Sequence, residues 1–178
     1  MPSIDIRPAV SNDIQALIQL THTCETAHTW QMNNLYEDGQ IQASFRRIRL
    51  PRPFLLEYPR TPSAILDCWT KKDLFLVARI ENQRSGYLAL EILERQSARI
   101  TDLVVDEPFR RQGIATAMLL SAQDWLRANG VYRTLMELPI KNEAVIAFAE
   151  KLGYVYSGFM DGFFGNREIA FFYSYTFR

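Results

Sequence analysis

Apolar and polar residues alternate along the second half of the chain with the period of two that is typical of β-strands. This alternation predicts three consecutive strands over residues 74–80, 86–93 and 98–105. Polar turns at residues 81–85 and 95–97 connect these strands, which makes antiparallel pairing the expected arrangement. Three more predicted strands, the last two of them rich in aromatic residues, cover residues 134–138, 154–160 and 169–177.

Helical spacing of apolar residues predicts three helices. Ser11 is expected to cap the first helix, in which the apolar residues lie three to four positions apart. The second helix begins at Gly113 and ends at the pair Asn129-Gly130. The third is predicted to begin at Asn142 and to stop at Gly153.

Periodicity is poor between residues 23 and 61. Apolar residues between Trp30 and Tyr36 suggest a further helical piece, and Asp38-Gly39 predicts a turn. Residues 41–50 read as an extended segment. The prolines that follow predict an irregular, exposed connection, and they stand at positions 51, 53, 59 and 62.

The order of these elements, with a short first strand at residues 4–6, predicts a single α+β domain over residues 1–178 with a mixed sheet. A chain of 178 residues, 48% of them hydrophobic and 22% charged, is large enough to bury one core. No repeat, low-complexity tract or linker interrupts the pattern.

Charge and cysteine usage exclude several classes of function. Twenty Lys and Arg residues balance twenty Asp and Glu residues, so no net field favours nucleic acid or an anionic membrane. No apolar run could span a bilayer and residues 1–5 do not begin a signal peptide, so we expect a cytoplasmic protein. Cys24 and Cys68 form no redox motif, and His22, Cys24 and His28 do not have zinc spacing, so no metal is expected.

The turn between the third strand and the second helix carries the strongest chemical signal. A strand that enters a helix through this turn directs several backbone N–H groups and the positive end of the helix dipole at one point. Such a point binds an anion such as pyrophosphate. The turn lacks the Gly-Lys-Ser/Thr of a kinase-type phosphate loop and the three-glycine spacing of a dinucleotide fingerprint. Its residues are Arg110, Arg111, Gln112, Gly113, Ile114, Ala115 and Thr116.

Three motifs at matching spacing resemble the GNAT superfamily of acyl-CoA-dependent N-acyltransferases. They are Arg110-x-x-Gly113-x-Ala115, the strand at residues 100–105, and Asn142-x-Ala144 followed by Phe148 and Leu152-Gly153-Tyr154. Residues 6–13 are similar to the family's first strand and helix, and residues 158–173 resemble members of the streptothricin acetyltransferase type. The resemblance implies a twisted, mostly antiparallel sheet of six to seven strands flanked by about four helices.

The resemblance also implies acetyl-CoA as cosubstrate and a primary amine, of a small molecule in our preferred interpretation, as acceptor. Residues 110–116 would hold the pyrophosphate. The strand residues Leu103, Val104 and Val105 would pair with pantetheine and supply the N–H that stabilises the thioester oxyanion. Asn142 and Phe148 would order the far wall. A protein N-terminus or lysine is the alternative acceptor, and a homodimer is compatible with the family.

Attack on the thioester requires a neutral amine, so a carboxylate should remove the amine proton. Asp102 is the first candidate for this base, Glu137 the second, and Glu91 a third. Many family members place a proton-donating tyrosine where this chain has Ala149. Three alternatives therefore stay open: departure of the thiolate without an acid, a catalytically silent CoA-binding protein, or protonation by a tyrosine at position 154, 156, 173 or 175.

The segment from Trp30 to Tyr58 would form the acceptor wall if the resemblance extends to it. Trp30, Tyr36, Glu37 and Asp38 are then acceptor contacts. A short basic run is expected to be a solvated strand face rather than a binding site, and its members are Arg46, Arg47, Arg49 and Arg52.

Overall fold

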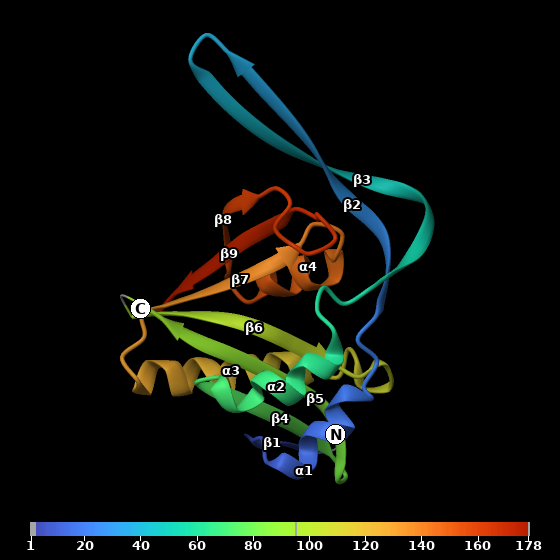
Figure 1. The fold of residues 1–178 in the computed structure, drawn as a ribbon, viewed down its shortest axis with the longest axis vertical. Helices are drawn as coiled ribbons and strands as arrows, with labels where there is room; N and C mark the ends of the chain where they lie inside the picture. The colour runs from blue at the N-terminus through green and yellow to red at the C-terminus, as the bar shows by residue number, and fades with distance from the viewer. Residues whose placement is uncertain (1–2, 95, 178) are drawn as a thin grey trace.

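A seven-stranded, mostly antiparallel sheet forms the body of the molecule, and a two-stranded hairpin crosses it and projects beyond it (Figure 1). The computed structural model describes residues 3–94 and 96–177. The sheet order is β1-β4-β5-β6-β7-β9-β8, and only β6 and β7 pair in parallel. The strands of the sheet are β1 (Ile4–Pro8), β4 (Leu74–Ile80), β5 (Gln83–Leu93), β6 (Ser97–Val105), β7 (Arg133–Pro139), β8 (Val155–Met160) and β9 (Ala170–Thr176). The predicted α+β class is therefore confirmed, and every strand predicted from alternation is present.

The parallel pair β6–β7 is short, and this shapes the molecule. Only Ser97–Ile100 pairs with Arg133–Met136, after which the two strands diverge and leave an open V (Figure 1). Strand β6 still pairs with β5 as far as Val105, with a bulge at Thr101 where the register shifts. From Thr101 onward, the edge of β6 that faces β7 lacks a strand partner.

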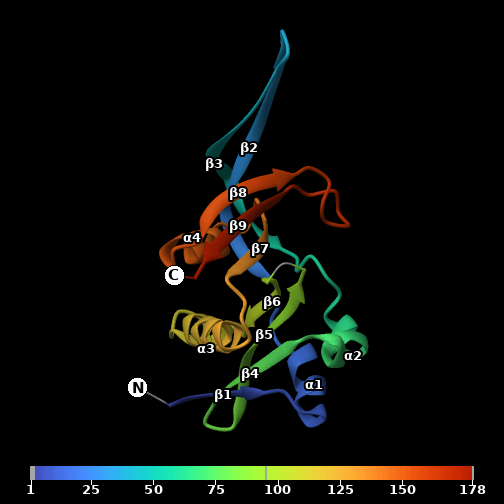
Figure 2. The ribbon, with the colours of Figure 1, turned by 90° about the vertical axis from the view of Figure 1, so that its left-hand side faces the viewer.

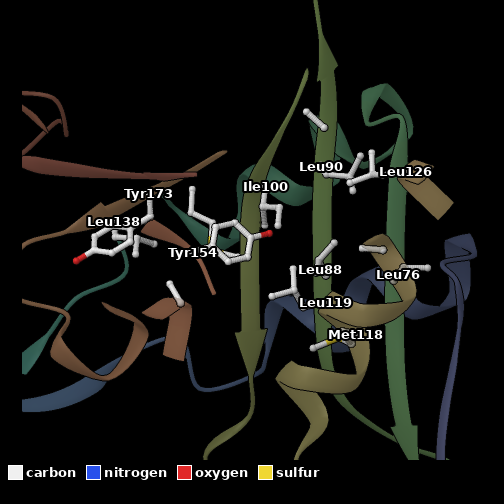
Figure 3. Packing of buried hydrophobic residues seen from close by; sticks show 14 of the residues in the cluster. Leu76, Leu88, Leu90, Ile100, Met118, Leu119, Leu126, Leu138, Tyr154 and Tyr173 are labelled. Carbon is white, nitrogen blue, oxygen red and sulfur yellow. The ribbon is translucent and has the colours of Figure 1, made fainter. Parts of the chain in front are cut away.

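Helices cover both faces of the sheet (Figure 2). Helix α1 (Ser11–Ile18) and the single turn α2 (Ile65–Cys68) pack on one face, against a cluster that includes Val77 and Tyr87. Helices α3 (Ile114–Ala128) and α4 (Glu143–Lys151) cover the other face, where Figure 3 shows the larger core. Short 3-10 turns lie at Pro62–Ala64, Trp69–Lys71 and Glu107–Phe109.

Most predicted helix ends are confirmed. Gly113 is the N-cap of α3 with φ of +85°, and the Asn142 side chain caps α4 by accepting a hydrogen bond from the Val145 amide at 3.2 Å. Gly130 and Gly153 follow the two helices with positive φ, the conformation that favours glycine there.

The cap of the first helix differs from the prediction. Val10 is the N-cap rather than Ser11, which is the first helical residue. The Val10 side chain cannot accept a hydrogen bond, and the carboxylate of Asp13 instead accepts one from the Val10 amide at 3.0 Å, as the third helical residue does in a capping box.

The largest error of the sequence interpretation lies in the hairpin. Strands β2 (Cys24–Glu37) and β3 (Gln40–Leu56) form a long antiparallel ribbon, so the predicted helical piece at 30–36 is wrong. Trp30, Met32 and Tyr36 share one face of the ribbon, whereas Leu35 lies on the other. The ribbon packs on the body at one end only, so no continuous buried face marks this segment as a strand. The predicted turn at Asp38-Gly39 and the extended segment at 41–50 are confirmed.

Two of the four prolines also lie inside a strand. Pro51 and Pro53 belong to β3. They lie between Arg49, which pairs with His28, and Phe54, which pairs with Thr26, and the register shifts between these two pairs because β3 bulges. A bulge is the position at which a strand tolerates proline, because no ladder amide is needed there.

No helix in the described part of the chain is long and apolar enough to cross a membrane. Of the predicted turn at 95–97, Arg95 lies outside the described residues, and Gln96 has the positive φ of a tight turn.

Candidate active site

A cavity occupies the open end of the V between β6 and β7. Its walls come from Ile100–Leu103 on β6 and Met136–Pro139 on β7, and from residues 56–60 that follow the hairpin. The remaining lining residues are His22, Cys24, Asn142, Val145 and Phe164. The cavity therefore forms where the sheet is split, with strand edges free of main-chain partners on either side.

Two carboxylates face each other across this cavity, with one cation between them. The Asp102 Oδ1 atom accepts hydrogen bonds from the Tyr58 hydroxyl at 2.6 Å and from Arg60 Nη1 at 3.0 Å. The Arg60 guanidinium also lies 4.0 Å from Glu137 Oε2. Both carboxylate side chains are about nine-tenths buried. No donor within the described residues is hydrogen-bonded to Asp102 Oδ2, which leaves that oxygen available to an incoming ammonium group.

Glu137 and Glu91 belong to a ladder of alternating charges along the sheet. Arg99 donates to Glu137 at 3.2 Å and to Glu91 at 2.7 Å, and Lys72 donates to Glu91 at 2.6 Å. The hydrogen bonds from Lys72 and Arg99 lower the pKa of Glu91. Glu91 does not line the cavity, so of the three predicted base candidates the fold brings together only Asp102 and Glu137.

Tyr58 and Arg60 are residues of this candidate site that sequence reasoning did not single out. Burial and the adjacent Asp102 charge raise the pKa of Tyr58 well above its ordinary value, so its hydroxyl remains a hydrogen-bond donor. Arg60 also donates to the Thr101 carbonyl. Both residues lie in the proline-rich connection after β3, where no periodicity marks a buried side, and only tertiary contact with β6 reveals them.

The turn before α3 has the geometry of an anion site. The first intrahelical hydrogen bond runs from the Ala117 amide to the Gly113 carbonyl at 2.9 Å, so the amides of Ile114, Ala115 and Thr116 have no intrahelical acceptor. Arg111 and Gly113 both have positive φ, at +64° and +85°, which turns successive N–H groups toward a common concavity. A Cβ atom added to Gly113 would meet nothing within 4 Å, so the space beside the turn is open.

Arg110 has a different position from the one expected of a phosphate ligand. Its guanidinium donates to the carbonyls of Val105 at 3.0 Å and of Thr21 and Thr23 at 2.8 Å each. The side chain therefore ties the segment between α1 and β2 to the end of β6. Its donors are used within the protein, whereas Arg111 is free of such contacts among the described hydrogen bonds.

The other predicted site residues divide between cavity and core. Leu103 and Asn142 line the cavity, whereas Phe148 packs against the main core and Val104 lies in the α1–α2 cluster. Val105 is the last residue of β6. It pairs with Gly86 of β5, and its side chain packs against the core on the α3 side.

The predicted tyrosines do not line the cavity. Tyr154 is buried in the core, where its hydroxyl lies 2.8 Å from Thr134 Oγ1, and Tyr173 donates to Glu150 at 2.8 Å. Tyr156 contacts Phe45 of the hairpin, and Tyr175 packs on Tyr154. Ala149 itself is fully buried, so the tyrosine of this cavity is Tyr58.

The predicted acceptor contacts on the hairpin are likewise not at the cavity. Tyr36, Glu37 and Asp38 form the distant end of the hairpin, which projects from the body (Figure 1). Trp30 packs against Phe171. Of the basic run, Arg46 and Arg49 are exposed, and Arg47 pairs with Glu143 of α4. No group of three metal-ligating side chains occurs within residues 3–94 and 96–177.

Comparison with known families identifies the class. Residues 42–154 match the acetyltransferase (GNAT) family model, which covers more than half of the chain. The chain therefore belongs to the GNAT acetyltransferase family. An uncharacterized N-acetyltransferase of Methanocaldococcus jannaschii is 30% identical over 91 residues, which cover 47% of this chain and 39% of that protein. The chain thus matches well under half of that relative's length.

Solved structures share the fold over nearly the whole chain. One is a protein of Bacillus anthracis provisionally assigned as a streptothricin acetyltransferase and solved with acetyl coenzyme A, with 18% identity, a TM-score of 0.77 and coverage of 99% and 98% of the two chains. A nourseothricin acetyltransferase has 16% identity, a TM-score of 0.84 and coverage of 98% and 99%. Ard1 of Thermoplasma volcanium has 20% identity, a TM-score of 0.71 and coverage of 98% of both chains.

Proposed function

We propose that this protein transfers an acetyl group from acetyl-CoA to a primary amine of a small cationic molecule, by direct attack in a ternary complex. The observation that carries the proposal is the pair of nearly buried carboxylates, Asp102 and Glu137, at the open end of the V. An acidic cavity attracts an ammonium group, and its enclosure by residues 56–60 suits a small molecule better than a peptide.

The residues on the donor side fit acetyl-CoA. The free amides of residues 114–116 and the Arg111 side chain would hold the pyrophosphate. The unpaired edge of β6 at Leu103–Val105 would accept the pantetheine amides as a further strand would. The thioester then enters the split between β6 and β7, where a β6 amide stabilises its developing oxyanion.

On the acceptor side, Asp102 is assigned as the general base and Glu137 as the second anion that holds the substrate's positive charge. The free Oδ2 atom of Asp102 takes the proton that the amine nitrogen loses as the new amide bond forms. Tyr58 and Arg60 hold the other oxygen of the same carboxylate, which leaves Oδ2 free to accept that proton. A base held in this way contributes about 10²–10⁴-fold to the rate.

The carbon–sulfur bond breaks as the tetrahedral intermediate collapses, and coenzyme A leaves as a thiolate. A thiol with an ordinary pKa near 8.5 is a tolerable leaving group without an acid. The proposed mechanism therefore does not need a tyrosine at position 149, and thiolate protonation is assigned to solvent.

A second candidate function follows from the alanine at position 149. Ala149 in place of the usual tyrosine also fits a CoA-binding protein that has lost catalysis. Turnover separates the two functions, because binding alone cannot release the thiol of coenzyme A.

The test is release of free thiol from acetyl-CoA by the purified chain in the presence of streptothricin-like antibiotics, aminoglycosides, polyamines or N-terminal peptides. We expect release with a small polycationic amine. Replacing Asp102→Asn should lower kcat about 10²–10⁴-fold with little change in acetyl-CoA affinity. Glu91→Gln is the matched control, because Glu91 is a paired carboxylate outside the cavity and its loss should leave kcat unchanged.

Other outcomes contradict the proposal in distinct ways. Release with peptides alone would replace the small-molecule acceptor by a protein one. A full kcat in Asp102→Asn would transfer the base role to Glu137, which Glu137→Gln would then test. Binding of acetyl-CoA without thiol release from any member of the panel would favour the catalytically silent function.

A further inference from the structure

The outer end of the β2–β3 hairpin has no packing surface of its own. We define this distal arm as residues 33–44, all of which are exposed. Its strands pair only with each other, from Asn33↔Ser44 to Glu37↔Gln40. Figures 1 and 2 both show it projecting into solvent, past the edge of the sheet that ends in β8.

Such a ribbon is not expected to persist alone in water. An isolated two-stranded hairpin is marginally stable, because it has no second layer against which to bury side chains. The distal arm nevertheless carries Leu35, Tyr36 and Ile41, which are 45%, 67% and 82% exposed. Apolar residues at these positions indicate that another surface covers them.

One face of the arm continues a face that already packs on the body. Directly opposed residues of a ribbon share a face, and faces alternate along each strand. On this face, Trp30 contacts Phe171 of β9, and Phe45 contacts Phe159 and Phe171. The same face continues outward to Tyr36 and Ile41. The Asn34–Ala43 pair separates the two parts of this apolar stripe, and its outer part lies beyond the surface that the chain itself provides.

A second exposed apolar surface lies at the free edge of the sheet, on β8. Strand β8 pairs only with β9, so its other edge has unpaired main-chain groups. Three of its apolar side chains, Val155, Tyr156 and Met160, are exposed. An open apolar edge and an uncovered apolar arm therefore lie side by side on one molecule.

We infer that the distal arm clasps a second copy of this chain in a twofold dimer. A twofold axis beside β8 would bring the partner's β8 and β9 beneath the arm, and the same contact would be made in return. A self-complementary pair of patches of this kind is what a twofold interface requires. Twelve arm residues and the six residues of β8 come close to the roughly 20–30 residues per partner of a standard interface.

The charge of the distal arm favours a second copy of this chain over an anionic partner. The distal arm contains Glu37 and Asp38 and no Lys or Arg. An anionic lipid surface or a nucleic acid would be repelled by this arm, since both attract basic segments. The exposed residues of β8 in the same molecule are uncharged, and three of them, Val155, Tyr156 and Met160, are apolar like the stripe.

The experiment is the solution mass of the full chain over a dilution series, by light scattering on a sizing column and by sedimentation velocity. We expect about 41 kDa, twice the chain mass of 20.7 kDa. Tyr36→Asp with Ile41→Asp should raise the dimer dissociation constant at least about a hundredfold, because it buries charge in the interface. Gln42→Asp with Ser44→Asp adds the same charge to the opposite face of the arm and should leave the dimer intact.

A variant with a shortened hairpin provides a second test that does not depend on correct folding of a substituted arm. Residues 33–44 replaced by Asn-Gly would join Met32 to Phe45 through a two-residue turn, and this chain should be monomeric with acetyl-CoA binding retained. A monomeric natural chain, a dimer that survives both arm changes, or equal disruption by the control pair would each overturn the inference. None of these results bears on thiol release, so the proposed function is tested separately.

Discussion

Arg110 and Arg111 are neighbours in one turn, yet their side chains have different partners. Arg110 is bound by three main-chain carbonyls from Val105 and the segment at 21–23. Arg111 is held in a left-handed conformation beside the open side of the turn. The spacing of the motif identifies the turn, but it does not tell which arginine meets the phosphates.

Matched substitutions separate these two roles. Arg110→Gln should lower the free energy of unfolding by about 2–3 kcal/mol, since a neutral amide cannot replace three charge-assisted hydrogen bonds. Arg111→Gln should leave stability unchanged and weaken acetyl-CoA binding severalfold. Urea unfolding and calorimetric titration measure the two effects. Weaker binding with normal stability in the Arg110 variant would reverse the assignment.

Tyr58 and Arg60 mark the limit of residue-level prediction. Asp102 and Glu137 are recognisable because they stand on predicted strands at a family motif. Tyr58 and Arg60 stand in a segment without periodicity, and their contacts to Asp102 span more than forty residues of sequence. Tyr154 shows the opposite outcome. It is a candidate proton donor from the sequence, but its hydroxyl is hydrogen-bonded to Thr134 within the core.

At the scale of elements, α3 has a glycine with positive φ at each end. Gly113 precedes it with φ of +85° and Gly130 follows it with φ of +73°. An added Cβ would find open space at either position. The two glycines therefore share the same backbone constraint, and only Gly113 adjoins the proposed phosphate site.

Valine at either position should strain the backbone by about 1–2 kcal/mol and lower the thermal midpoint of unfolding to a similar extent. Only Gly113→Val should also weaken acetyl-CoA binding, by tenfold or more, because its side chain would fill the phosphate concavity. Isothermal titration of both variants measures the difference. Equal affinities in the two variants would place the pyrophosphate elsewhere.

The hairpin is the element that local sequence predicted least well. Its turn at Asp38-Gly39 is a short-range feature and was predictable. The strand assignment of residues 30–36 depends on pairing with β3 and on contacts of Trp30 and Phe45 with β9. No local pattern contains that information, because most of the ribbon is buried on neither face.

At the scale of the whole molecule, Asp13 joins the first strand, the first helix and β5. Its buried carboxylate accepts hydrogen bonds from Arg7 at 2.7 and 2.9 Å, from the Val10 amide at 3.0 Å and from Arg84 at 3.1 Å. Burial alone would raise the pKa of Asp13, but these hydrogen bonds outweigh it and lower the pKa to about 2.

The lowered pKa makes stability depend on pH in a defined direction. An unfolded aspartate titrates near pH 3.9, so the stabilisation from Asp13 is fully present above about pH 4 and is lost as the pH falls through about 2. The shift of about two pH units corresponds to ~2–3 kcal/mol. Asp13→Asn should therefore be less stable than the natural chain at pH 7, by at least that amount, and the gap should narrow between about pH 4 and 2.

Urea unfolding at several pH values measures this gap. Asp5→Asn is the control, because Asp5 is largely exposed and its contact with Arg79 is 3.7 Å long. A surface pair of this kind contributes at most about 1 kcal/mol. A gap that stays constant down to pH 2 would show that Asp13 stabilises the fold through its packing rather than its charge.

The sequence by itself determined the strands from residue 74 onward, the helix ends at Gly113, Asn142 and Gly153, and the family to which the chain belongs. These features depend on the spacing of neighbours and on backbone torsions that the residue itself favours, so they can be read locally. Only the tertiary structure decided the hairpin, the position of Arg110, the burial of Tyr154 and the presence of Tyr58 and Arg60 at the cavity. Each of these depends on which distant residue lies within hydrogen-bond or packing distance, as when Arg110 meets Thr21 across 89 positions of sequence. Such contacts arise from the packing of whole elements, and no short stretch of the chain encodes them.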